Sequence, residues 1–561
     1  VFPREELIQS STSELFSTAM AVNQIQERRQ VRLFVRHGHY GKFVNCLVYT
    51  PREIYHTDLR EKIEHILCDA YGAKESEFTT FFSESILTRT HFVLRVDPSA
   101  SLTVDERLLE EEIIKVTMSW LDQLRNHLLE EFGEENGTAI HESYVTAFTP
   151  GYMHDFEPRA AVDDIKKIQE LRSDDDIAMN FYRRYSDPDN HLCFRLFHRS
   201  SAVALSDVMP ILENLGLRVL GEHPYKVNSR SEGCIWVHEF RLQYSRIETV
   251  DIKEISTVFE QAFSRIWYGD AESDLFNRLI IGSGLAWRDI AMLRAYAKYM
   301  RQIQFNFSND YIAETLFNHT AIARLLVRLF YQRFDPAINI SNEERLLRVK
   351  VIEDEIYAGL ETVDNLSEDR IIRQYVALLN ATMRTNFFQC ESNAELKSYF
   401  SFKLQPDNIP DMPLPRPMFE IFVYSPRVEG VHLRGGKVAR GGLRWSDRLE
   451  DFRTEVLGLV KAQQVKNAVI VPAGAKGGFV SKRPPSDSSR EALQAEGIAC
   501  YQIFIQALLD ITDNLQEGKI IPPADVVRLD DNDSYLVVAA DKGTATFSDI
   551  ANEISHRYGF W

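Results

Sequence analysis

Residues 467–478 read NAVIVPAGAKGG, and this stretch decides how the last part of the chain is expected to fold. Four of its first five residues are apolar and three are β-branched, which predicts a buried strand. The small residues that follow cannot shield Lys476, so we expect this lysine at the carboxyl end of the strand, against a bound molecule. A P-loop is excluded because Gly477, rather than Ser or Thr, follows the lysine. The alternative is a lysine with a purely structural role.

A second stretch, residues 534–541, reads SYLVVAAD and predicts a continuous buried strand that ends on a carboxylate. A helix is expected from about residue 546. Asp541 should therefore lie at the same sheet edge as Lys476. An amine and a carboxylate at that edge form an acid–base pair for a substrate that exchanges protons. Asp541 could equally be an N-terminal cap of the helix.

A third stretch, residues 439–445, reads ARGGLRW. The Arg440 guanidinium beside Gly441 and Gly442 offers bidentate donors and bare backbone N–H groups to a carboxylate. The surrounding residues 431–482 hold ten Lys or Arg against four Asp or Glu, although the whole chain carries a net charge of −18. We therefore expect a small anion to bind here, the alternative for residues 439–445 being a basic surface turn.

Length and composition limit the class of protein. A chain of 561 residues with 44% hydrophobic residues should form several globular domains. The acidic total argues against a nucleic-acid partner, and the longest uncharged run, residues 497–509, is too short to span a membrane. The six cysteines are scattered, which predicts that they are reduced. No residues at metal-ligand spacing surround His37 and His39, so we expect no metal site. The sequence shows no export signal, which predicts a cytoplasmic protein.

The order of expected elements divides the chain. Strands and one helix in the order β-β-α-β-β are expected twice, at residues 31–96 and again at 177–244, and these modules resemble ACT-like regulatory domains. Five prolines within residues 405–417 predict a domain boundary. The expected domains are an ACT-like α+β module (1–100), a helical linker (101–170), a second ACT-like α+β module (171–270), a helical domain (271–404) and an α/β substrate-binding domain (405–561).

Residues 440–444 and 474–478 together resemble motifs of the glutamate dehydrogenase family, specifically its large NAD-dependent branch with a long N-terminal regulatory extension. The resemblance implies that Lys476 is the catalytic lysine and Asp541 the catalytic aspartate. Substrate binding would fall to five residues. Gln463 and Lys466 would hold the α-carboxylate, and Arg440 the γ-carboxylate, with Gly441 and Gly442 beside it. Arg440 stands where the family has lysine, which keeps the charge and changes its geometry. Residues 482–489 are expected to form a loop that is inserted relative to the small hexameric members of the family.

The resemblance implies oxidative deamination of L-glutamate to 2-oxoglutarate and ammonia, with NAD as hydride acceptor, in a cytoplasmic homo-oligomer regulated by an amino-acid effector. No strand–Gly-x-Gly-x-x-Gly–helix unit occurs up to Trp561, and Gly282-Ser283-Gly284 lacks the βαβ context. We therefore expect the NAD-binding domain beyond residue 561 and no turnover by this chain alone. The alternatives are an amino-acid sensor without catalysis and a branched-chain amino-acid dehydrogenase, which would want an apolar residue in place of Arg440.

Overall fold

The computed structural model describes residues 3–25, 28–83, 85–97, 104–185, 187–244, 246, 251–466, 473–487 and 489–561. The chain forms two compact units, one of Val1–Asp174 with Tyr225–Ile235 and one of Asp175–Pro224 with Trp236–Trp561. Two four-stranded sheets, a helical segment and a seven-stranded sheet confirm the expected mixture of α+β and α/β architecture.

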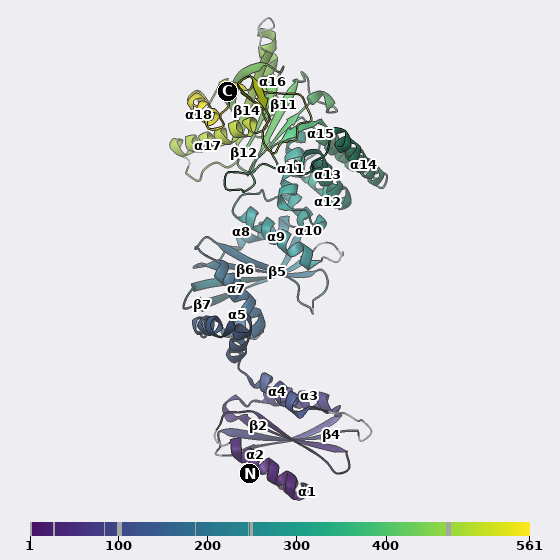
Figure 1. Ribbon diagram of the computed structural model, residues 1–561, viewed down its shortest axis with the longest axis vertical. Coiled ribbons are helices and arrows are strands. Elements are labelled where there is room, and N and C mark those ends of the chain that lie inside the picture. The colour runs from purple at the N-terminus through teal and green to yellow at the C-terminus, as the bar shows by residue number, and fades with distance from the viewer. Residues whose placement is uncertain are drawn as a thin grey trace. The chain divides into compact units, whose positions relative to one another are not determined.

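The first unit begins with an antiparallel sheet of strand order β1-β2-β4-β3. Its strands are β1 (Arg32–His37), β2 (Phe43–Pro51), β3 (Glu75–Phe82) and β4 (Leu87–Arg95). Helices α3 (Thr57–Tyr71) and α4 (Glu106–Thr117) cover one face, and α1 (Arg4–Gln9) and α2 (Thr12–Ile25) lie on the other (Figure 1). A short 3-10 turn, η1 (Arg52–Ile54), precedes α3. The predicted order β-β-α-β-β is confirmed.

Alternation along the strands fixes which side chains meet the helices. Val44, Cys46 and Val48 of β2 pack with Leu59 and Ile63 of α3 in one buried core. The neighbouring residues of each strand point to the opposite face, where α1 and α2 lie. Helices therefore cover both faces of β2 and β4, whereas the edge strand β3 is largely exposed.

The rest of the first unit is helical. It contains α5 (Trp120–Tyr144), α6 (Pro150–Asp155) and α7 (Pro158–Glu170). Gly133 breaks α5 with φ of 79°, a left-handed conformation that glycine adopts without strain. Residues 225–235 belong to the same compact unit as these helices. The Tyr225 hydroxyl donates a hydrogen bond to Asp155 of α6 at 2.6 Å.

The second unit opens with a sheet of order β5-β6-β8-β7, the same arrangement as the first. Its strands are β5 (Ile177–Tyr182), β6 (His191–Arg199), β7 (Leu217–Ser229) and β8 (Gly233–Tyr244), with helices α8 (Leu205–Asn214) and α9 (Ile252–Trp267). Phe181 of β5 stacks on Phe259 of α9 with ring centroids 3.9 Å apart. The second predicted β-β-α-β-β pass is thus confirmed.

A helical segment follows the second sheet. It consists of η2 (Leu275–Asn277), α10 (Arg278–Ser283), α11 (Trp287–Gln302), α12 (Asn309–Asn318), α13 (Thr320–Phe334), α14 (Asn342–Leu360) and α15 (Leu366–Ala381). Gly284 ends α10 in the left-handed conformation, with φ of 67°. Gly282-Ser283-Gly284 is therefore the end of a helix, not a nucleotide-binding turn.

The seven-stranded sheet has the order β17-β13-β14-β12-β11-β10-β9. Its strands are β9 (Thr382–Thr385), β10 (Phe400–Leu404), β11 (Phe419–Tyr424), β12 (Val428–Arg434), β13 (Ala439–Trp445), β14 (Ala473–Ser481) and β17 (Val537–Ala540). Strand β13 pairs in parallel with β14 and β17, whereas the pairs from β14 to β9 are antiparallel.

Helix α16 (Phe452–Lys466) packs on β14 from one face, and α17 (Arg490–Leu509) packs from the other with α18 (Ser548–Arg557). A small hairpin, β15 (Asn514–Gln516) and β16 (Lys519–Ile521), follows α17.

This sheet extends across the proline-rich segment, which includes η3 (Pro406–Asn408). Strands β9 and β10 precede the prolines and pair with each other, and β10 pairs with β11 after them. The helical pattern expected up to residue 404 therefore ends at Ala381. The prolines form a connection between two neighbouring strands, where no ladder hydrogen bond is needed.

Helix α17 is the one helix among the described residues that is long and apolar enough to cross a membrane, judged by length and composition. It contributes Cys500, Phe504 and Leu508 to a buried core with Phe479 of β14. Its apolar character is accounted for by this packing.

Candidate active site

The glycine-rich stretch around Lys476 is itself a central strand, whereas the sequence predicts Lys476 at the carboxyl end of the strand before it. Lys476 lies inside β14, opposite Leu433 of β12, with β13 on the other side. Glycine is depleted in strands, so local propensity does not favour a strand here. The glycines are required because neighbouring groups approach closely: a Cβ on Gly477 would lie 2.4 Å from Leu443 Cδ2. The strand expected at residues 467–471 lies outside the described residues.

The register of β13 and β14 assembles the site. Arg440 pairs with Gly474 and Arg444 with Gly478, so Gly442 lies beside Lys476 on the same face. Helix α16 covers this face, since a Cβ on Gly474 would meet the Gln463 side chain. Segments that are distant in sequence thus converge on one face of the sheet.

Lys476 and Asp541 meet as an ion pair. Lys476 Nζ lies 3.1 Å from Asp541 Oδ2, and both side chains are about one-fifth exposed, at 21% and 18%. Burial raises the pKa of Asp541, but the hydrogen bond from the Lys542 backbone and the Lys476 ammonium outweigh it, so the pKa lies below its ordinary value. Asp541 is therefore a carboxylate near neutral pH.

The Asp541 side chain does not cap a helix. Helix α18 begins at Ser548, and its N-cap residue, Phe547, provides no side-chain cap. Strand β17 covers only Val537–Ala540 at the sheet edge and is mostly exposed, whereas the sequence predicts a longer buried strand. An edge position explains the difference, because one neighbour, β13, pairs with it.

Arg444 is a further residue of the site, and the sequence motif predicts no role for it. Its Nη2 lies 3.3 Å from Asp541 Oδ1, and its Nη1 lies 2.8 Å from Glu455 Oε1 of α16. Ser446 donates to the other Glu455 oxygen at 2.6 Å. Asp541 is thus held between two cations, Lys476 and Arg444. The alternation of β13, which puts residues 440, 442 and 444 on one face, is the sequence signal for this contact.

The other expected substrate-binding residues lie around this pair. Gln463 is half-buried, and its Oε1 has no hydrogen-bond partner among the described residues. Arg440 is exposed and makes no ion pair within the described part of the chain. Lys466 ends α16, but its side chain lies outside the described residues.

Gly441 and Gly442 have tight surroundings. A Cβ on Gly441 would lie 1.5 Å from the Ala475 carbonyl oxygen, and a Cβ on Gly442 would lie 2.9 Å from Asp541 Cβ. Both positions therefore demand glycine for packing. The absence of a side chain at Gly442 makes room for Asp541 beside Lys476.

Most cations of residues 431–482 are neutralised, so their excess is not by itself an anion site. Arg434, Arg453 and Lys482 are buried and pair with Asp533, Glu420 and Glu429 at 2.7, 2.6 and 2.8 Å. Their partners lie outside residues 431–482, so a count of the charged residues within that segment does not include them. Within the described residues, Arg440 and Lys461 keep an unpaired positive charge.

A buried network fixes the segment that precedes β17. Asp533 accepts from Arg434 and from Lys403, and Arg384 pairs with Asp513 and Asp530 at 3.0 and 2.5 Å. Removing one member of such a network leaves an unpaired buried charge. The network therefore anchors the chain a few residues before Asp541.

Comparison with known proteins covers nearly the whole chain. Residues 355–561 match the model described as bacterial NAD-glutamate dehydrogenase, catalytic domain. Five further glutamate dehydrogenase models match: ACT2 at residues 32–121, ACT3 at 176–255, and helical motifs 1, 2 and 3 at 1–28, 127–171 and 271–336.

Proteins named NAD-specific glutamate dehydrogenase are similar over the full chain. The identity is 53% to that of Pseudomonas aeruginosa, 52% to that of Halomonas elongata and 42% to that of Mycobacterium tuberculosis. In each case all of this chain is covered, against 35%, 34% and 36% of the relative. The chain thus spans about a third of the length of these relatives.

Proposed function

The chain belongs to the family of bacterial NAD-dependent glutamate dehydrogenases, and from this premise we propose that the whole protein oxidatively deaminates L-glutamate to 2-oxoglutarate and ammonia. This chain would supply the substrate side of the active site. The observation that carries the proposal is the Lys476–Asp541 pair, 3.1 Å apart on a sheet face that also presents Arg440.

Two carboxylates of the substrate need two cationic or polar positions. Gln463 and Lys466 of α16 would bind the α-carboxylate, and the exposed Arg440 guanidinium would bind the γ-carboxylate. The unpartnered Gln463 Oε1 could accept from the α-ammonium group or from a neighbouring donor once a ligand binds. Because Gly441 and Gly442 have no side chains, they would not block the approach of the substrate to Lys476. Fixing both ends orients the α-carbon.

The proton steps would fall to Lys476 and Asp541. Asp541 would accept a proton from the substrate amine, as its lowered pKa keeps it ionised at neutral pH. After the α-carbon has lost its hydride, Lys476 would orient water for attack on the imine carbon and stabilise the carbinolamine that forms. Asp541 would then return the proton to the departing ammonia. Arg444 would hold Asp541 in position through this cycle.

NAD would accept the hydride. Among the described residues, no glycine-rich turn joins a parallel strand to a helix in the manner that dinucleotide binding requires. We therefore assign no NAD site to this part of the chain, and the roles above concern protons and carboxylates alone.

We also propose how the protein is regulated, how it assembles and in which compartment it acts. The two sheets that match ACT models would bind an amino-acid effector, and the protein would act as a cytoplasmic homo-oligomer. All six cysteines are free, which suits a reducing compartment.

The decisive test is Lys476→Ala in the full-length protein. Because the ammonium takes part in the chemical step, we expect NADH formation from L-glutamate to fall at least about a thousandfold in kcat, with the fold unchanged by circular dichroism. Asp541→Asn should cause a similar loss. Lys461→Ala is the matched control, since Lys461 is an exposed lysine of α16, and it should retain near-normal kcat. Near-normal turnover by the Lys476 variant would refute the assignment.

A further inference from the structure

A polar cluster lies on the face of the first sheet that is turned away from α3 and α4. Arg36 of β1 pairs across the sheet with Asn45 of β2, and Asn45 pairs with Val93 of β4. His91 of β4 lies two residues before Val93 and shares this face. Arg36, Asn45 and His91 are all largely buried, and none of them has a role in the proposed reaction.

One carboxylate, that of Glu6, satisfies this cluster. Arg36 Nε and Nη2 donate to the two Glu6 oxygens at 2.6 and 2.7 Å. When the Asn45 amide is assigned so that both of its polar atoms have partners, its nitrogen donates to Glu6 Oε1 at 3.3 Å and its oxygen accepts from Arg36 Nη2 at 2.9 Å. His91 Nε2 lies 3.6 Å from Glu6 Oε1. Arg36, Asn45 and His91, here called the carboxylate cradle, therefore form a site shaped for one carboxylate.

Helix α1 is held to the sheet by Arg36, which donates to Glu6 and also to Gln9 Oε1 at 3.2 Å. It has six residues, and Glu6, with a side chain 3% exposed, is the buried one among its described side chains. Leu7 and Ile8 are 48% and 85% exposed. A helix of six residues is not stable by itself in water. Its binding to the sheet thus depends on Glu6 occupying the cradle.

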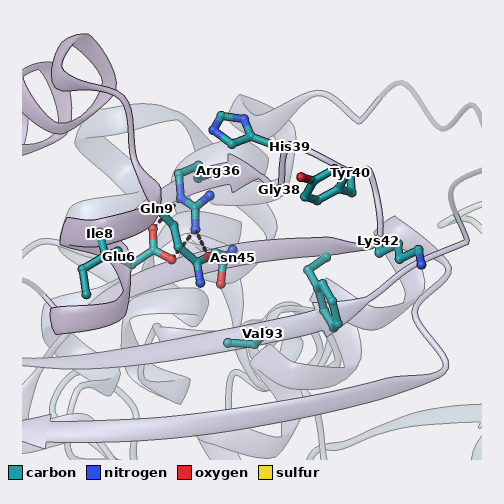
Figure 2. A pocket seen from close by; sticks show the side chains of 11 residues that line it. Glu6, Ile8, Gln9, Arg36, Gly38, His39, Tyr40, Lys42, Asn45 and Val93 are labelled. Carbon is teal, nitrogen blue, oxygen red and sulfur yellow. Dashed lines mark hydrogen bonds and ion pairs between the residues drawn. The ribbon is translucent and has the colours of Figure 1, made fainter.

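A cavity of about 740 Å³ opens beside the cradle. Figure 2 shows Glu6 reaching from α1 toward Arg36 and Asn45, with Tyr40 and His39 of the β1–β2 turn farther along the cavity. Phe43 and Val93 add apolar surface, and Lys42 adds a second cation to the lining. The volume lies within the range of about 300–1,000 Å³ that small-molecule sites occupy.

We propose that the carboxylate cradle and this cavity form a binding site for a small carboxylate-bearing molecule with an apolar body. The carboxylate of that molecule takes the place of Glu6 on Arg36 and Asn45, and the apolar body lies against Tyr40, Phe43 and Val93. Glu6 is then a tethered competitor, which leaves the cradle together with α1 when the molecule binds. Ile8 and Gln9 of α1 also line the cavity and leave with it, so the site that remains is formed by β1, β2, β4 and the β1–β2 turn.

The test uses 4-fluorophenylacetate as probe and the 561-residue chain, with fluorine NMR line broadening as readout. The acid should bind, and its neutral counterpart 2-(4-fluorophenyl)ethanol should not. Glu6→Gln should tighten binding of the acid about tenfold, because the tethered anion no longer competes. The double variant Glu6→Gln/Arg36→Met removes both partners of the ion pair and should abolish binding without leaving a buried charge unpaired.

Two controls locate the site. Arg95→Met removes an exposed arginine of β4 and should leave the binding unchanged. Lys476→Ala should also leave it unchanged, which separates this site from the proposed active site. The inference is overturned if the alcohol binds as well as the acid, if Glu6→Gln does not tighten binding, if the double variant still binds, or if Lys476→Ala removes binding. None of these outcomes depends on glutamate turnover.

Discussion

The two four-stranded sheets share one strand order, yet they hold their buried carboxylates differently. In the first sheet, Arg36 binds Glu6, which comes from the separate helix α1. In the second sheet, Arg195 of β6 lies 2.8 Å from Glu239 of β8, a strand of the same sheet. Tyr182 of β5 also donates to Glu239, at 2.7 Å. The second cluster is thus built from neighbouring strands, and the first depends on a short helix.

This difference decides what each carboxylate can do. Glu239 cannot leave Arg195 unless strands separate, so the contact is coupled to the stability of the whole sheet. Glu6 can leave with a six-residue helix while β1, β2 and β4 stay paired. Local opening of this kind costs much less free energy than opening a sheet. The same ion-pair chemistry therefore stabilises one module and provides an exchangeable site in the other.

The largest expected effect comes from Glu239→Leu, which removes the buried carboxylate that Arg195 and Tyr182 both contact. Breaking a buried pair on one side costs about 3–5 kcal/mol. Hydrogen exchange should show loss of amide protection along β6 and β8. Glu213→Leu, at an exposed position of α8, is the control and should leave the protection unchanged. Unaltered exchange in the Glu239 variant would mean that this cluster does not stabilise the sheet.

A smaller effect is expected from Glu6→Leu. Because Arg36 lies on an edge strand and can reach water once α1 detaches, the free energy of unfolding of the sheet should fall by less than about 1 kcal/mol. Amide protection should be lost within residues 4–9 and kept in β1, β2 and β4. Glu77→Leu, at an exposed position of β3, serves as control. Loss of protection throughout the first sheet would remove the contrast between the modules.

The smallest effect is a pH dependence of the α1 contact. Burial raises the pKa of Glu6, but the hydrogen bonds and charges of Arg36 and His91 outweigh it and lower the pKa from 4.5 to about 2. A carboxyl whose pKa is depressed in the folded state stabilises above its unfolded pKa. The contact should therefore persist above pH 4.5 and weaken as pH falls from 4.5 toward 2. Exchange of residues 4–9 measured over this range should follow that course in the wild type and not in Glu6→Gln.

The sequence was a good guide wherever one local pattern was enough. Alternating strands and one amphipathic helix predicted both sheets to within a few residues. Lys476 and Asp541 were expected at one place in the sheet, and the structure brings them within 3.1 Å. Strand periodicity and residue chemistry carry this information without knowledge of the fold.

The predictions from sequence were wrong where contacts with residues distant in the chain determine the structure. The sequence predicted Lys476 at the end of a strand, but it lies inside β14, which pairs with β12 and β13. The glycines of β14 leave room for the side chains of Leu443, Val456 and Gln463. The cationic segment predicted an open anion site, but Asp533 and Glu420 reach Arg434 and Arg453 from other strands and loops. A count along the chain does not include partners that are distant in sequence.

The sequence by itself determined the composition of the site and the order of the elements: an amine, a carboxylate and a guanidinium on strands, after two repeated α+β modules. Only the tertiary structure decided that Arg444 holds Asp541, that most of the neighbouring cations are neutralised, and that Glu6 occupies the cradle of Arg36 and Asn45. The reason is physical. Strand and helix periodicity is a property of adjacent residues, whereas the strength of a charge depends on burial and on partners that folding brings within a few ångströms.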